Sequence, residues 1–265
     1  MDLSTSTSRY ADPTLPLWRE AFAGFDWLSL RLSSVFAGMG IERGRGEAVV
    51  LVPGLLAADA SMMELSGWLA RLGYAPYVSG IGVNALSSEP AIVRLLATID
   101  RAYTETGAPV RLVGHSLGGV IARGAALRDP DRVAQVITLG SPVQGLGAHP
   151  AVLAMARMIH GDDIDGCLKA SQQPLPGGIA ETNIYSKSDG VVDWRTCSRD
   201  DATAVEVGGT HTGLIANAEA YRAIATALAG ASVCESAMVR RPGRGRVEGA
   251  KVRAGGDACA TRVAA

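Results

Sequence analysis

A serine flanked by glycines is the strongest chemical signal in the sequence. Gly114-His115-Ser116-Leu117-Gly118 follows the apolar run Arg111-Leu112-Val113 and precedes a segment with helical spacing. This G-x-S-x-G pattern between a strand and a helix predicts a sharp turn that exposes the serine Oγ. A side chain at either flanking glycine would collide with the neighbouring strand or helix. Ser116 is therefore the candidate nucleophile for acyl transfer.

A serine hydroxyl is a weak nucleophile and needs a neighbouring base. The chain contains four histidines: His115 adjoins the serine, and His149 and His160 fall in a segment that interrupts the strand–helix pattern. His211 lies in a glycine-rich loop after the last expected strand, where its side chain can reach the carboxyl edge of a sheet. We therefore expect His211 to be the general base.

A carboxylate is needed to hold such a base in the correct tautomer and to stabilise its charged form. In the strand–turn–helix version of this chemistry the acid lies between the serine and the histidine along the chain. Asp189 directly follows an expected strand and is the predicted acid, with Asp193 as the alternative. Either aspartate could instead cap a turn.

Backbone amides are expected to stabilise the oxyanion. One amide belongs to Leu117, the residue after the nucleophile, and the other to the loop that follows the first central strand. Gly54 lets that loop turn, so that Leu55 presents its N–H, with Leu56 as a second candidate and a substrate-binding residue. Trp194 is either a second substrate-binding residue or a packing residue beside the acid.

The elements that must position these residues alternate between strands and helices. Short apolar runs separated by helical spacing predict βαβ units and a mostly parallel sheet, hence an α/β fold. The expected strands are 48–52, 74–79, 110–113, 133–139, 183–186 and 204–207, and the expected helices are 59–72, 89–106, 117–127 and 217–228.

Three further segments flank or interrupt this pattern. Residues 1–46 form an N-terminal extension, in which apolar residues three or four apart over 14–39 predict an amphipathic helix. We expect its apolar face to pack on the body, with membrane or partner contact as the alternative. Within the catalytic domain, 47–230, residues 142–180 form a lid insertion. Residues 231–265 lack Leu, Ile, Phe, Tyr and Trp and are predicted to be a disordered tail.

From about residue 47 to 229 the chain resembles the α/β-hydrolase superfamily, in particular the bacterial lipases and esterases of the triacylglycerol-lipase-like group. The similarity rests on Pro53-Gly54-Leu55, Gly114–Gly119, Ser188–Val192 and His211–Leu214. It implies helices on a mostly parallel sheet, a Ser116–Asp189–His211 triad and no cofactor or metal. Many relatives have His-Gly where this chain has Pro53-Gly54, but the amide of interest comes later in the loop.

The expected function is that of a serine carboxylic ester hydrolase that forms an acyl-enzyme. The apolar insertion indicates an apolar acyl group on a small-molecule or lipid ester. The same triad could serve a thioesterase, an acyltransferase or a polyester depolymerase, and a non-catalytic binding scaffold is the alternative outside the enzymes. Acyl chain length, alcohol group, lid motion and oligomeric state are left open by the sequence.

Composition narrows the class of protein further. The 265 residues carry 25 basic and 26 acidic side chains, and the tail alone holds seven basic and three acidic ones, which leaves 18 against 23 elsewhere. A mildly acidic body excludes a typical nucleic-acid-binding domain. The N-terminus lacks a secretory pattern, so we expect a cytoplasmic protein, or a secreted one if a signal has been removed. Reduced thiols are expected, with a Cys167–Cys197 disulfide as the alternative.

Overall fold

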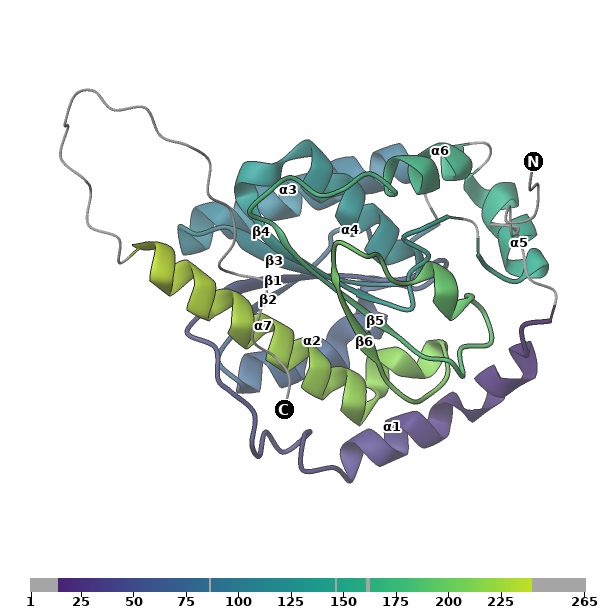
Figure 1. The fold of residues 1–265 in the computed structure, drawn as a ribbon, viewed down its shortest axis with the longest axis horizontal. Helices are drawn as coiled ribbons and strands as arrows, with labels where there is room; N and C mark the ends of the chain where they lie inside the picture. The colour runs from purple at the N-terminus through teal and green to yellow at the C-terminus, as the bar shows by residue number, and fades with distance from the viewer. Residues whose placement is uncertain (1–13, 86, 146, 161–162, 240–265) are drawn as a thin grey trace, which may run out of the picture.

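The computed structural model describes residues 14–85, 87–145, 147–160 and 163–239 (Figure 1). Six strands form one sheet in the order β2-β1-β3-β4-β5-β6, and every pair in it is parallel. The strands are β1 (Ala48–Val52), β2 (Ala75–Val78), β3 (Val110–His115), β4 (Val133–Leu139), β5 (Ala180–Tyr185) and β6 (Thr203–Glu206). This architecture confirms the α/β-hydrolase fold expected from the sequence.

Helices cover both faces of the sheet (Figure 1). One face packs against α3 (Ser88–Thr106) and α4 (Leu117–Arg128), and the other against α2 (Met63–Arg71) and α7 (Ala218–Val239). In β1 the side chains alternate between these layers, with Val50 in the first core and Val49 and Leu51 in the second. Because both faces are buried, the central strands are continuous apolar runs rather than alternating ones.

The strand order determines where a site can form. The chain leaves β1 to build β2 on one side, then crosses back to build β3 on the other. Ligands of open parallel sheets bind beyond the carboxyl ends of the strands at such a reversal. The loops after Val52 of β1 and His115 of β3 meet there, and they carry the expected oxyanion loop and nucleophile.

Most element boundaries agree with the sequence to within a few residues. Strand β4 has the predicted bounds, whereas β5 begins at Ala180 because that residue pairs with Gln135 of β4. The largest difference is in α7, which continues to Val239 instead of ending near residue 228. The first nine residues of the predicted disordered tail are thus helical, consistent with the alanine-rich sequence. Residues 240–265 lie outside the described residues.

The N-terminal extension differs from the prediction in how it meets the body. A 3-10 helix, η1 (Leu17–Phe22), leads into α1 (Ala23–Arg31), so the helical segment ends well before residue 39. The apolar stripe is largely exposed rather than packed, with Trp18 66%, Phe25 69% and Leu32 80% exposed. Within α1 only Leu30 is buried. Leu30 and Val35 do pack into the core as predicted, and further contacts with the body are made by acidic residues, described below.

The insertion contains α5 (Pro150–His160) and α6 (Asp163–Ala170). At its start, Ala148 forms an antiparallel bridge with Val192, and Leu153 of α5 packs into a small core with that residue. Just beyond α6, buried Arg123 of α4 donates to the carbonyls of Ser171 (2.7 Å) and Gln173 (2.6 Å). The guanidinium also pairs with Glu181 of β5. Both ends of the insertion are therefore fixed to the body.

No helix in the described ranges combines the length and apolarity that crossing a membrane requires.

Candidate active site

Ser116 sits at the turn between β3 and α4, where the sequence predicts a strained nucleophile. Its φ is 53° and its ψ is −127°, a region that residues other than glycine rarely occupy. Such a conformation costs on the order of 1–3 kcal/mol and persists only where surrounding contacts enforce it. Here the Ser116 N–H donates to the carbonyl of Leu139 in β4 over 2.8 Å. The turn is thereby attached to the neighbouring strand.

The glycines on both sides of Ser116 are required by close backbone contacts. A Cβ built on Gly114 would lie 2.5 Å from the Gly118 carbonyl oxygen and from the Gly119 backbone. A Cβ on Gly118 would collide with the carbonyls of Val52 and Pro53 in the oxyanion loop. The glycine pattern thus lets the nucleophile turn approach the β1 loop, as the sequence predicts.

His211 and Asp189 meet at the same end of the sheet. His211 Nδ1 lies 2.7 Å from Asp189 Oδ2, and both side chains are buried. The other carboxylate oxygen, Oδ1, accepts the amides of Val191 and Val192, each at 2.8 Å. These two amides fix the carboxylate so that its Oδ2 faces the imidazole. Nδ1 then carries a proton, which leaves Nε2 as the basic nitrogen.

The charges around His211 favour its protonated form. Burial lowers the pKa of the imidazole, but the Asp189 carboxylate, through charge and hydrogen bond, and the Glu20 carboxylate outweigh it. The net effect raises the pKa of His211 above its usual value. A base that becomes cationic during proton transfer gains from such surroundings.

His115, identified from the sequence only as a neighbour of the serine, supports this base. Its Nε2–H donates to the backbone carbonyl of His211 over 2.9 Å, and the two rings lie 4.8 Å apart. Burial, together with the neighbouring His211, lowers the pKa of His115 to about 3. His115 is therefore a neutral positioning group rather than a second base.

Ser116 and His211 are brought to the same edge but are not hydrogen-bonded to each other within the described residues. Gly140 follows Leu139, whose carbonyl accepts the Ser116 amide, and it lies beside the acid–base pair. A Cβ at Gly140 would lie 3.1 Å from both His211 Nδ1 and Asp189 Oδ2. Catalytic hydrogen bonds are often long before substrate binds, so the lack of a Ser116–His211 hydrogen bond among the described residues does not argue against proton transfer.

Two backbone amides remain available for an oxyanion. In the loop after β1, the Leu56 amide donates to the Asn84 carbonyl over 2.9 Å. Among the described residues, no protein acceptor takes the amides of Leu55 or Leu117. Asn84 also donates its side-chain amide to the Pro53 carbonyl over 2.8 Å, which fixes the loop. Leu55 and Leu117 thus fit the predicted pair better than Leu56, whose N–H is occupied.

The alternative acid and the two predicted substrate-binding residues have distinct places. Asp193 accepts the Arg195 backbone amide over 3.0 Å and caps the short helix η4 (Trp194–Thr196), so it does not contact His211. Trp194 stacks on Tyr185 with ring centroids 5.8 Å apart, in the packing role that the sequence left open. Leu56 has positive φ, and its side chain is 46% exposed. Substrate contact by Leu56 or Trp194 stays a prediction.

Cys197 is a free thiol, which agrees with the expectation of reduced cysteines rather than a disulfide with Cys167. Burial, together with the Asp189 and Asp193 carboxylates, raises the pKa of this thiol well above its usual value. Cys197 therefore has a packing role beside the acid loop. The Cys167 side chain lies outside the described ones.

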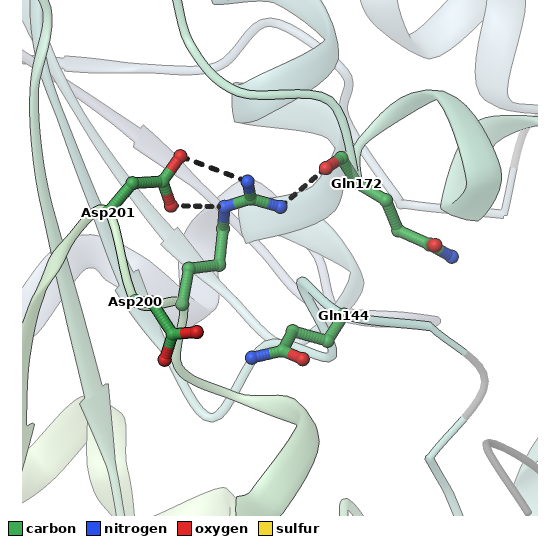
Figure 2. Close-up of a pocket in the computed structure, with 5 residues that line it drawn as sticks. Gln144, Gln172, Asp200 and Asp201 are labelled. Atoms are coloured by element: carbon green, nitrogen blue, oxygen red, sulfur yellow. Dashed lines mark hydrogen bonds and ion pairs between the residues drawn. The ribbon is translucent and has the colours of Figure 1, made fainter. Parts of the chain in front are cut away.

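A polar pocket of about 290 Å³ lies apart from these residues (Figure 2). Its lining consists of Gln144, Gln172, Arg199, Asp200 and Asp201. Arg199 is already paired with Asp201 over 2.8 and 3.0 Å and donates to the Gln172 carbonyl. Since its cation is paired and all five lining residues are polar or charged, the pocket does not suit an acyl chain. No cluster of three metal-ligating side chains occurs in the described part of the chain.

Sequence reasoning missed two acidic residues of the N-terminal extension. Glu20 accepts the backbone amide of His211 over 3.0 Å, and Asp26 accepts that of Thr210 over 3.1 Å. These contacts join positions 191 and 184 residues apart. The only signal was the presence of acids within an otherwise apolar helical stretch, which does not specify a partner.

Comparison with known proteins assigns the chain to a family. The pattern of the palmitoyl protein thioesterases matches residues 48–188, which is more than half of the 265 residues. The chain belongs to the palmitoyl protein thioesterase family. The matched segment contains Ser116 and ends one residue before Asp189, so it includes neither the acid nor His211.

Solved structures with the same fold are lipolytic enzymes. A structure of the metagenome-derived lipolytic enzymes LipS and LipT is 16% identical, covers 71% of this thioesterase-family chain and 96% of its own, and has a TM-score of 0.56. The mature Bacillus licheniformis lipase BlEst2 is 18% identical over 66% and 89%, with a TM-score of 0.51. The Paleococcus ferrophilus monoacylglycerol lipase is 18% identical over 71% and 97%, also with 0.51. These likenesses show the fold, and the family match makes this chain an esterase- or thioesterase-like hydrolase.

Proposed function

We propose that the protein is a serine hydrolase of apolar acyl esters that uses Ser116, His211 and Asp189. The observation that carries the proposal is the buried 2.7 Å contact between His211 Nδ1 and Asp189 Oδ2 beside the strained Ser116 turn. An acid–base pair of this kind beside a half-buried serine has the chemistry of acyl transfer.

The proposed reaction has two balanced halves. Ser116 Oγ attacks the acyl carbon, its proton passes to His211 Nε2, and the Leu55 and Leu117 amides stabilise the oxyanion. Collapse of this intermediate breaks the bond to the leaving group, which takes the proton from His211 and departs. Water then attacks the acyl carbon and gives its proton to His211. The bond to Ser116 Oγ breaks as His211 returns that proton to Oγ, and the free acid leaves. Oxyanion donors act where charge develops, and each is typically worth about 10²–10³ in rate.

A thioester substrate is the second candidate. The supporting observation is the family itself, whose name specifies palmitoyl protein thioesterases. A thiolate is a better leaving group than an alkoxide, so the same residues suffice for both bonds. The apolar insertion, with Leu153 and the half-buried Val152 and Met155 on α5, fits an acyl chain in either case.

Replacement of Ser116 tests this proposal. We expect Ser116→Ala to abolish hydrolysis of p-nitrophenyl esters from acetyl to palmitoyl, and of palmitoyl thioesters, while its melting temperature stays near that of the wild type. A fluorophosphonate probe should label only the wild type. An S116A variant that hydrolyses these substrates at the wild-type rate would exclude Ser116 as nucleophile. The ratio of ester to thioester turnover separates the two substrate classes.

We further propose that the N-terminal extension contacts a lipid surface. Its exposed Trp18, Phe22 and Phe25 form an aromatic series, with ring centroids 6.1 Å apart in each consecutive pair. Arg19 lies over the Trp18 ring at 5.7 Å and Arg31 over the Trp27 ring at 5.0 Å. Aromatic residues bordered by cations suit the headgroup layer of an anionic bilayer.

A further inference from the structure

The acid loop and the base loop are both bound by one carboxylate of the N-terminal extension. Glu20 Oε1 accepts the Gly190 amide over 3.1 Å and the His211 amide over 3.0 Å. Its other oxygen, Oε2, accepts the Thr212 amide over 2.7 Å. Glu20 therefore joins the residue after Asp189 to His211 itself and to the residue after it.

Asp26, less than two helical turns further on, holds the other side of the base loop. Its Oδ2 accepts the Thr210 amide over 3.1 Å and the Thr210 hydroxyl over 3.0 Å. Its Oδ1 accepts the Asn217 side-chain amide over 3.3 Å. Together, the two carboxylates accept three consecutive backbone amides, those of residues 210 to 212.

The catalytic loops are shaped to receive this segment. A Cβ on Gly190 would lie 2.5 Å from the Pro16 carbonyl and 3.1 Å from Glu20 Oε1. A Cβ on Gly209 would lie 2.8 Å from Asp26 Oδ1, and one on Gly213 would collide with Asp26. Three loop glycines thus allow a backbone approach that larger residues would block.

The contact with the catalytic loops is made by polar groups, whereas Leu30 and Val35 attach the extension to the core. The large apolar side chains of this segment, such as Trp18 and Phe25, face solvent, whereas Glu20 and Asp26 face the loops. Charge-assisted hydrogen bonds are directional and define the position of a loop backbone more tightly than apolar contact. The segment also lies outside residues 48–188, so it is an addition to the part that defines the family.

We infer that Glu20 and Asp26 are positioning residues that hold the His211 loop against Asp189 in the geometry needed for proton transfer. This inference rests on the proposed Ser116–His211–Asp189 mechanism. A shift of about 1 Å in a catalytic group can cost about 10²-fold in rate. The Glu20 charge has a second effect, because it also raises the pKa of His211.

The test compares Glu20→Gln and Asp26→Asn with wild type, and with Glu42→Gln as the matched control. Glu42 belongs to the same extension but is exposed and lies away from the catalytic loops. Rates are divided by the concentration of fluorophosphonate-reactive sites, so that unfolded protein does not count. We expect E20Q and D26N to lower kcat for p-nitrophenyl esters by about 10- to 100-fold with little change in KM. In E20Q the acidic limb of the pH–rate profile should also move to lower pH.

Glu20→Asp separates the effect of the negative charge at position 20 from the effect of side-chain length. It keeps the negative charge, so the acidic limb should stay near its wild-type position, but the shorter side chain cannot hold both loops and kcat should fall. The inference is overturned if E20Q and D26N keep the wild-type kcat per reactive site, or if both variants are unfolded, which would make the segment only a folding element. Wild-type activity in S116A would overturn the proposed function instead, so the two failures are distinct.

Discussion

His115 donates its Nε2–H to the backbone carbonyl of His211, and so the residue before the nucleophile supports the residue expected to act as its base. The surroundings shift the pKa values of the two imidazoles in opposite directions. Burial lowers the pKa of His115 to about 3, whereas Asp189 and Glu20 overcome burial and raise the pKa of His211. One imidazole is thereby kept neutral while the neighbouring one is prepared to accept a proton.

His115 should make stability depend on pH below neutrality. Its folded pKa is depressed, so its contribution is complete above about pH 6.5 and is lost as the pH falls toward 3, because only the unfolded chain takes up the proton. His115→Gln keeps an N–H donor near the Nε2 position and should flatten this dependence in urea unfolding between pH 5 and 7. Identical slopes in wild type and H115Q would contradict the assignment, and His149→Gln serves as the control.

The rate of ester hydrolysis should rise with pH as His211 loses its proton. Because the pKa of this histidine is raised, the acidic limb of the kcat/KM profile should have its midpoint above the ordinary value of about 6.5. Initial rates with a short p-nitrophenyl ester at constant ionic strength measure it. A midpoint at or below 6.5 would mean that the carboxylates do not act on the essential base as the geometry indicates.

Asp189→Asn and Asp193→Asn should differ strongly in activity. Loss of the Asp189 carboxylate permits the wrong imidazole tautomer, and we expect kcat to fall by about 10⁴-fold, as in other triads of this type. D193N keeps a side-chain oxygen that can cap η4, so it should leave both the folding free energy and kcat near their wild-type values. Comparable losses of kcat in both variants would remove the distinction between the two acids.

The aromatic series of the N-terminal extension should bind anionic vesicles. Replacing Trp18 and Phe25 by alanine is expected to lower co-sedimentation with phosphatidylcholine–phosphatidylglycerol vesicles by at least about tenfold, because each ring contributes about 1.5–3 kcal/mol when buried. Val93→Ala, an exposed apolar position on α3, is the control. Unchanged vesicle binding of the double variant would contradict this prediction and favour contact with a protein partner instead.

Local patterns predicted those parts of the molecule that depend on adjacent residues. The pattern Gly114–Gly118 was enough to predict the turn. A side chain at Gly114 or Gly118 would collide with neighbouring backbone, and the pattern itself implies that this backbone is close. The bounds of β4 followed from seven apolar-rich residues between breakers. The His211–Asp189 pair followed from chain order and strand ends.

Relationships between distant segments could not be predicted in this way. An apolar stripe normally indicates a buried face, yet Trp18 and Phe25 are exposed because the polar side of their segment meets the catalytic loops. Nothing near Glu20 specifies that three amides, about 170 or more residues away, require an acceptor. Likewise, α7 continues beyond residue 230 because this segment has sufficient helix propensity. Its lack of large apolar residues had instead predicted disorder.

The two fixed ends of the insertion have a practical consequence. Its start is bridged to the acid loop through Ala148 and Val192, and its end is held by Arg123 through Ser171 and Gln173. The intervening helices can therefore be treated as an exchangeable cassette for protein engineering. An insertion from a relative could be grafted between these anchor points while the turn that carries Ser116 keeps its own support from Leu139.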